Sequence, residues 1–73
     1  AEPSGLREAL RRYRLSQARL REIPPFAVFS DAVLDALVED RPQSRQGFLA
    51  IRGLGPAKWA QYGADILEKI GEH

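Results

Sequence analysis

The residues with the clearest chemical potential lie in a glycine hairpin at residues 52–56, followed closely by Lys58. Two glycines around one leucine allow the backbone to turn through positive φ, and Pro56 suits the first position of a helix because its missing N–H costs nothing there. Such a turn directs free amides outward. With Lys58 and the positive end of the new helix, it predicts a phosphate-binding loop. The structural alternative is that Gly53 and Gly55 only allow two helices to pack closely.

Carboxylates form the second group whose spacing matters. Asp31, Asp35 and Glu39 are four residues apart, so they lie on one face of a helix, with Asp40 next to them in sequence. This acidic ridge is either a solvated helix face or a docking surface for a basic partner. We expect no metal site, because carboxylates on one helix do not converge around a cation. The single histidine, His73, lies at the chain end and is not expected to act as a base or a ligand.

The composition indicates one small helical domain. The 73 residues include no cysteine, which excludes disulfides, thiolate zinc sites and cysteine nucleophiles. No apolar run approaches the roughly 20 residues needed to cross a bilayer, and no Walker-type loop is present for ATP. We therefore expect no membrane contact, no cofactor and no independent enzymatic activity. The domain is predicted at residues 5–71, with 1–4 as a linker or cloning remnant and 72–73 as a frayed end.

The net charge of +1 conceals an uneven order along the chain. Residues 1–21 sum to +4 and residues 22–40 to −5, after which residues 41–58 sum to +4 and residues 59–73 to −2. The overall charge is therefore a poor guide, because a domain can hold a basic patch and an acidic patch on different faces and still be nearly neutral in sum.

Apolar periodicity and capping residues predict the helices. The first is expected from Ser4, as its N-cap, to about Leu20, with Leu15 opposite the buried stripe and therefore exposed. Ser30 predicts the N-cap of a helix over 31–40, and Ser44 that of a brief third helix. The stripe of the first helix comprises Leu6, Leu10, Tyr13 and Leu20.

The last helix is predicted from Pro56 to Ile70. Gly63 within it is expected to permit close approach of another helix, and Asp65 and Lys69 are expected to form an i,i+4 ion pair on the solvent side. No stretch shows β alternation. The fold class is therefore all-α: a compact bundle of four to five short helices, with the glycine hairpin before the last one. The face predicted to be buried on the last helix comprises Trp59, Gly63, Ile66, Leu67 and Ile70.

The combined order of motifs resembles an HRDC domain, the helicase-and-RNase-D C-terminal module found in RecQ-type DNA helicases. The likeness covers residues 6–70 and is closest to the modules of bacterial RecQ-family helicases. The segments that carry it are residues 10–18, 24–31, 41–42 and 49–55, then Lys58, Tyr62-Gly63 and Ile66-Leu67.

The resemblance implies a non-catalytic accessory domain of an ATP-dependent DNA helicase. It would bind single-stranded or branched DNA weakly and without sequence preference, or dock on other domains of the parent helicase. ATP and magnesium are expected only in the helicase core of that parent. The resemblance also implies a cytoplasmic location, associated with the nucleoid in a bacterium, and a monomer in isolation. A single helix-hairpin-helix element unrelated to helicases is the alternative fold.

The family's nucleic-acid surface maps onto Phe26, Gly53, Gly55 and Lys58, and Arg52 joins them because of its charge and position. Phe26 stands where the family often has tyrosine, so it can stack on a base but cannot hydrogen-bond a phosphate. Its alternative role is a core residue beneath the turn. The acidic ridge is expected to interrupt the basic surface and to weaken DNA binding; as an alternative function, the ridge would dock a basic domain of the helicase.

Overall fold

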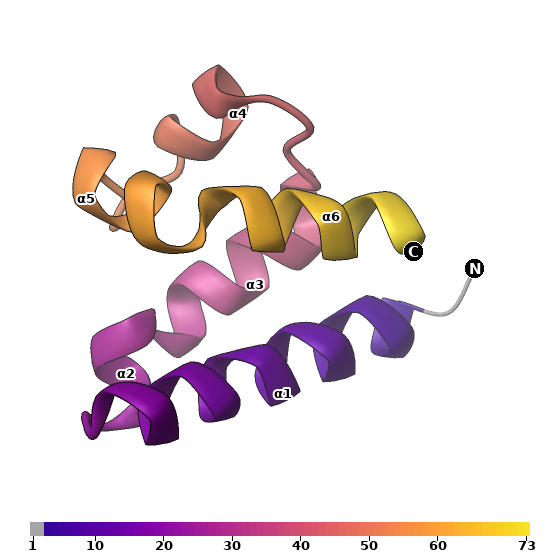
Figure 1. The fold of residues 1–73 in the computed structure, drawn as a ribbon. Helices are drawn as coiled ribbons and strands as arrows, with labels where there is room; N and C mark the ends of the chain where they lie inside the picture. Colours follow the sequence, from indigo (N-terminus) through magenta and orange to yellow (C-terminus); the bar gives the residue numbers. More distant parts are fainter. Residues whose placement is uncertain (1–2) are drawn as a thin grey trace.

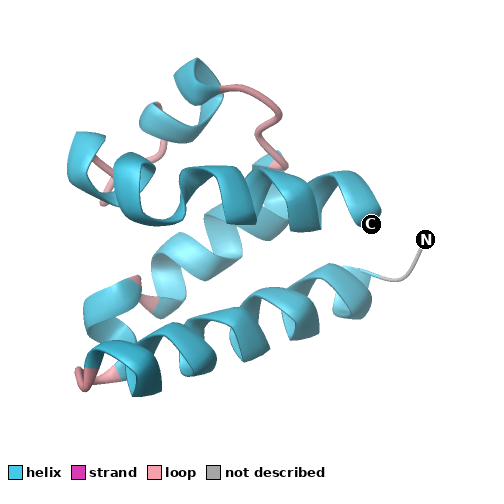
Figure 2. Ribbon diagram, viewed as in Figure 1, coloured by secondary structure: helices cyan, strands magenta, loops and turns pink. Residues whose placement is uncertain are grey.

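The computed structural model describes residues 3–73, and every regular element within them is helical (Figure 2). This confirms the predicted all-α fold class. The last three elements follow one another without a break and form one continuous rod. The elements are α1 (Pro3–Arg21), α2 (Pro25–Val28), α3 (Asp31–Asp40), α4 (Arg45–Leu49), α5 (Pro56–Lys58), the π-helical segment η1 (Trp59–Gly63) and α6 (Ala64–Glu72).

The chain passes along the length of the molecule three times (Figure 1). Helix α1 runs to the end where α2 turns the chain, α3 returns, and the rod from α5 to α6 begins near α2 and ends near the start of α1. Helix α1 contacts α2, α3 and α6, while α4 packs on η1. This path brings α2, the glycine hairpin and α5 to the same end of the bundle.

The core is formed by buried apolar side chains from α1, α2, α3, α4, η1 and α6, together with Leu54 of the hairpin. Leu6, Leu10, Leu37, Phe48 and Ile66 are completely buried. Phe48 also meets the ring of Trp59 edge-on, with the two ring centroids 5.2 Å apart. Since a domain of this size buries only about 60% of its unfolded surface, these few side chains carry most of its apolar stabilisation.

Local capping signals are confirmed at two of the three predicted N-caps. The hydroxyls of Ser30 and Ser44 accept hydrogen bonds from the amides of Val33 and Gly47, at 3.2 and 3.1 Å. The predicted N-cap at Ser4 is wrong because α1 already begins at Pro3. Proline is favoured in the first turn of a helix, where its missing N–H is not needed. Residues 1–2 of the predicted linker lie outside the described residues.

The C-terminal ends of α1 and α6 also differ from the sequence-based predictions. Leu20, placed in the buried stripe of α1, is 75% exposed, and Ala18 is buried at that end instead. The chain turns back there, with the Ile23 amide bonded to the Ala18 carbonyl at 2.9 Å, so the turn covers Ala18 and leaves Leu20 outside. Leu15 is exposed, as predicted. Helix α6 continues to Glu72, two residues beyond the predicted end.

In the π-helical segment, Gly63 has a different role from the one predicted. A Cβ at Gly63 would lie only 2.3 Å from Cε3 of Trp59, so this glycine makes room for an indole of its own helix rather than for a neighbouring helix. Tyr62, in the same π-helical segment, is buried as well; it lies three residues after Trp59 and four before Ile66, on the same helix face. The predicted face otherwise holds, since Ile66 and Ile70 are buried.

Asp65 and Lys69 both turn to Tyr13 rather than forming the predicted ion pair. The Tyr13 hydroxyl donates to Asp65 Oδ2 at 3.0 Å, and Lys69 Nζ lies 5.4 Å from the centre of the Tyr13 ring. Burial, and then the hydrogen bond to Asp65, raise the pKa of Tyr13. This cluster joins α1 to α6 through a polar contact at the edge of the core.

Candidate functional site

The five residues predicted to bind DNA lie on α2, the hairpin and α5, which meet at one end of the bundle (Figure 1). These residues differ in their surroundings. The contacts of each residue decide whether it is available to a ligand or holds the fold together.

Phe26 is the aromatic side chain that this end presents to solvent. Helix α2 begins with Pro25 and is anchored by Val28, which is completely buried. Phe26 lies two residues before Val28, and two residues in a helix point about 200° apart. Its side chain is therefore directed outward and is 72% exposed. The alternative role of Phe26 as a core residue is wrong.

Lys58 holds the last helix against α2. Its Nζ donates a hydrogen bond to the Ala27 carbonyl at 2.5 Å and lies 5.7 Å from the centre of the Tyr62 ring. The guanidinium of Arg21 lies 5.0 Å from the same ring, so two cations flank one aromatic side chain. Lys58 thus adds positive charge close to Phe26, but its ammonium is already engaged by a main-chain acceptor.

The two hairpin glycines have different roles. Gly53 has φ +97°, and a Cβ there would lie 2.8 Å from Val33 Cγ2, so both conformation and space require glycine. Gly55 has φ −122°, in the extended region open to any residue, and nothing lies within 4 Å of the Cβ position. Of the two hairpin glycines, Gly53 alone makes the turn through positive φ. Leu54 between them is buried and anchors the loop, while Arg52 and Gly53 are exposed.

Arg52 faces a shallow groove between α3 and the hairpin. The groove is also lined by Asp40, near the end of α3, and by the small side chains of Ala32 and Ala36. An acidic side chain thus shares the groove with the exposed arginine. This lowers the positive potential on that side of the hairpin, in the direction expected from the sequence.

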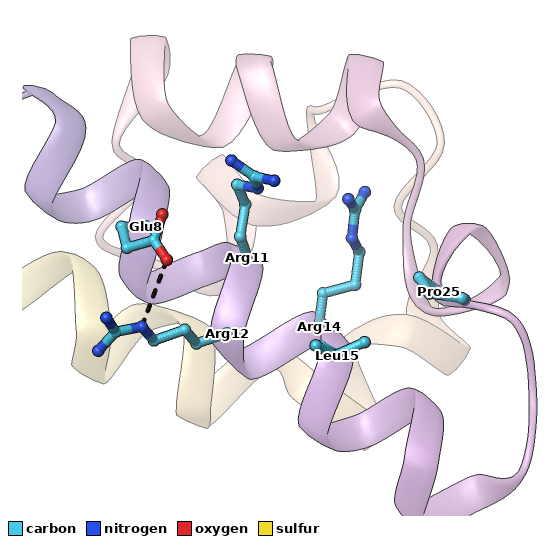
Figure 3. A pocket seen from close by; sticks show the side chains of 6 residues that line it. All are labelled: Glu8, Arg11, Arg12, Arg14, Leu15 and Pro25. Carbon is cyan, nitrogen blue, oxygen red and sulfur yellow. Dashed lines mark hydrogen bonds and ion pairs between the residues drawn. The ribbon is translucent and has the colours of Figure 1, made fainter.

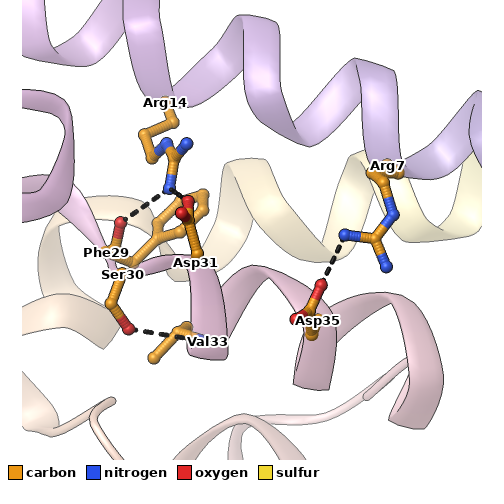
Figure 4. A network of polar contacts seen from close by, with 7 residues as sticks. All are labelled: Arg7, Arg14, Phe29, Ser30, Asp31, Val33 and Asp35. Atoms are coloured by element: carbon orange, nitrogen blue, oxygen red, sulfur yellow. Dashed lines mark hydrogen bonds and ion pairs between the residues drawn. The ribbon is translucent and has the colours of Figure 1, made fainter.

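The acidic ridge is paired with α1 at two of its four carboxylates (Figure 4). Arg14 Nη1 contacts Asp31 Oδ1 at 2.8 Å and the Phe29 carbonyl at 3.2 Å, and Arg7 Nη1 contacts Asp35 Oδ1 at 2.5 Å. The arginine-rich first block and the acidic second block therefore face each other between α1 and α3. The packing of the two helices thus brings opposite charges together along this face. Glu39 and Asp40 are exposed.

The sequence of this chain matches the model of a known protein family. The family model described as "HRDC domain" matches residues 4–70, nearly all of the chain. This chain belongs to the HRDC family. The α2 segment, the hairpin with Gly53 and the lysine of α5 are thus parts of an HRDC domain.

Similar sequences occur in two classes of helicase. The HRDC domain is 38% identical over 61 residues to "ATP-dependent DNA helicase UvrD2" of Mycobacterium tuberculosis strain H37Rv, covering 84% of this chain and 9% of that protein. It is also 38% identical over 69 residues to "ATP-dependent DNA helicase RecQ" of Bacillus subtilis, covering 94% of this chain and 12% of that protein. The chain thus spans about a tenth of the length of these relatives.

A solved structure has the same fold. It is "D. radiodurans RecQ HRDC domain 3", with 30% sequence identity and a TM-score of 0.92, and the match covers 99% of this chain and 95% of that one. The suspected resemblance to a RecQ-type module is confirmed at the level of the family and of this neighbour.

Two kinds of feature are absent from the described residues. Within residues 3–73 the structure holds no group of three or more His, Asp or Glu side chains suited to a metal ion. None of the described helices has the length and apolar character of a membrane span.

Sequence analysis did not single out Arg14 or Tyr62 as site residues. For Arg14 a signal was available, because residues 1–21 and residues 22–40 carry opposite net charges.

Proposed function

We propose that this HRDC domain is a non-catalytic accessory domain of an ATP-dependent DNA helicase. In that role it binds single-stranded or branched DNA weakly and without sequence preference. The curated relatives of both classes carry the name of ATP-dependent DNA helicases, which supports a parent of that kind. The RecQ-type neighbour in structure favours a RecQ-type parent.

The observation that carries the proposal is the exposed ring of Phe26. The side chain has 72% of its surface open to water, so its apolar ring stays hydrated in the free domain and can be covered by a ligand. A ring at the tip of a short helix is accessible to an unpaired base on its face. Base–aromatic stacking is tolerant of sequence because every base presents a π-face.

The charges around Phe26 suit a nucleic-acid backbone but are few. Arg52 is exposed on the hairpin and Arg21 is exposed beside Tyr62, while Lys58 adds positive charge nearby with its ammonium bound to the Ala27 carbonyl. With two or three phosphate contacts we expect a dissociation constant on the order of micromolar or weaker at physiological salt. Because base edges are not read by these groups, binding extends to any single strand or to the unpaired part of a junction.

Fluorescence anisotropy of a labelled oligothymidine, titrated at several salt concentrations, tests the proposal. Phe26→Ala should weaken binding by about fivefold or more, since stacking contributes about 1–3 kcal/mol per base. Leu20→Ala is the matched control, because it removes an equally exposed apolar side chain from α1 and should leave affinity within about twofold. Absence of binding at low salt, or equal affinity of Phe26→Ala and the parent domain, would refute DNA binding at this end.

A further inference from the structure

A second surface, on α1, combines positive charge with an exposed leucine and lies outside the residues assigned to DNA. Leu15 is 42% exposed and separates two adjoining hollows. The first is lined by Glu8, Arg11, Arg12, Arg14, Leu15 and Pro25 (Figure 3). The second, on the other side of Leu15, is lined by Arg12, Leu15, Ser16 and Arg19. We call these residues together the Leu15 face.

The charge of the Leu15 face is strongly positive. Its two hollows hold four arginines and a single carboxylate, Glu8. Arg14 is committed to Asp31 and to the Phe29 carbonyl. Arg12 contacts Glu8 at 3.3 Å, but both side chains are largely exposed, and such surface pairs contribute little and exchange readily. Arg11 and Arg19, and Arg12 on release of Glu8, can therefore meet incoming carboxylates.

The centre of the face is apolar. Leu15 and Pro25 both line the first hollow, and Figure 3 shows Arg11 and Arg14 extending in one direction from α1 while Arg12 extends away from them toward Glu8. The aliphatic stems of these arginines add apolar surface around Leu15. The result is an aliphatic centre surrounded by guanidinium groups, which bind carboxylates through paired N–H donors.

We propose that the Leu15 face docks an acidic peptide segment that carries a large apolar side chain, with its carboxylates on Arg11, Arg12 and Arg19 and its apolar group against Leu15 and Pro25. A nucleic-acid strand would satisfy the arginines but gains little from an aliphatic side chain, because stacking requires an aromatic or guanidinium plane. The apolar centre therefore favours a peptide. This docking surface has the opposite sign to the acidic ridge and does not include Phe26.

The test uses two fluorescein-labelled peptides of aspartate and glutamate, one with two leucines and one with serines in their place. Anisotropy should show tighter binding of the leucine peptide, and Leu15→Ser should weaken that binding about tenfold, which corresponds to burial of part of a leucine side chain. Leu20→Ser is the matched control on the same helix, outside both hollows, and should change affinity by less than about twofold.

Oligothymidine binding separates this proposal from the DNA-binding one. Leu15→Ser should leave oligothymidine affinity unchanged within about twofold, while Phe26→Ala should affect oligothymidine and not the peptide. Equal binding of the leucine and serine peptides, or none, would overturn the proposal. So would loss of oligothymidine affinity in Leu15→Ser, which would assign the face to DNA, or concentration-dependent self-association that Leu15→Ser abolishes, which would assign it to a second copy of the chain.

Discussion

The Lys58→Met variant tests whether this lysine binds phosphate or holds α2 in place. Methionine keeps an unbranched apolar stem and removes the ammonium, so it deletes the hydrogen bond to the Ala27 carbonyl and the cation beside the Tyr62 ring. A hydrogen bond from a charged donor contributes about 1.5–3 kcal/mol, and a partly exposed cation–π contact about 0.5–1 kcal/mol. We expect the free energy of unfolding to fall by about 2 kcal/mol, and the melting temperature by roughly 10 °C.

Arg52→Met is the matched control, because it removes one positive charge from the exposed hairpin. It should change the free energy of unfolding by less than about 0.5 kcal/mol. Arg52→Met should instead change DNA binding. Loss of one phosphate contact lowers the slope of log affinity against log salt concentration by about 0.7 for a single strand. Thermal unfolding followed by circular dichroism and salt-titrated anisotropy together separate the two residues.

The double variants sharpen the comparison. If Lys58 acts by positioning α2, Lys58→Met weakens oligothymidine binding through Phe26 and has little further effect once Phe26 is already alanine. Arg52→Met should keep its full effect in the same background. The reasoning is refuted if Lys58→Met retains the parent melting temperature while reducing the salt slope by about 0.7, since that result describes a lysine free to contact phosphate.

Two further predictions concern the fold that carries these sites. Gly53→Ala should lower the free energy of unfolding by about 1–3 kcal/mol because of its φ of +97° and the contact with Val33, while Gly55→Ala should stay within about 0.5 kcal/mol; equal melting temperatures would contradict this. For Tyr13, whose pKa is raised by burial and then by Asp65, the neutral phenol is the form that the fold favours, so its contribution is complete below the unfolded pKa of about 10 and is lost as pH rises above it. Urea unfolding of the parent domain should show that loss, and Tyr13→Phe should flatten it; parallel pH profiles would argue against the assignment.

The helices were largely predictable because their signals are local. Pro56 at the start of α5, the hydroxyls of Ser30 and Ser44, and the apolar repeats of α1 and α6 act within a turn or two of the chain. The exceptions are also local in extent. The start of α1 at Pro3 and the π-helical segment Trp59–Gly63 each change a helix over only a turn or so.

The availability of the site residues was not predictable in the same way. The pattern of residue types was equally consistent with two roles for Phe26, a base-stacking ring or a core residue. It was also consistent with two roles for Gly53, part of a phosphate-binding loop or a glycine that allows close packing. Exposure of Phe26 follows from Val28 occupying the core, and the requirement for glycine at residue 53 follows from its φ of +97° and from the contact with Val33 on α3. Neither contact has a signature in the sequence around the residue concerned.

The sequence by itself determined that this chain is an all-helical HRDC domain with a glycine turn before its last helix, because caps, prolines and apolar period act over short distances. Tertiary structure alone decided which charges are engaged. Lys58 meets a carbonyl 31 residues away, and Arg7 meets a carboxylate 28 residues away. Such pairs form only when helices pack, since the Coulomb energy of a charge depends on what the fold places within a few ångströms of it.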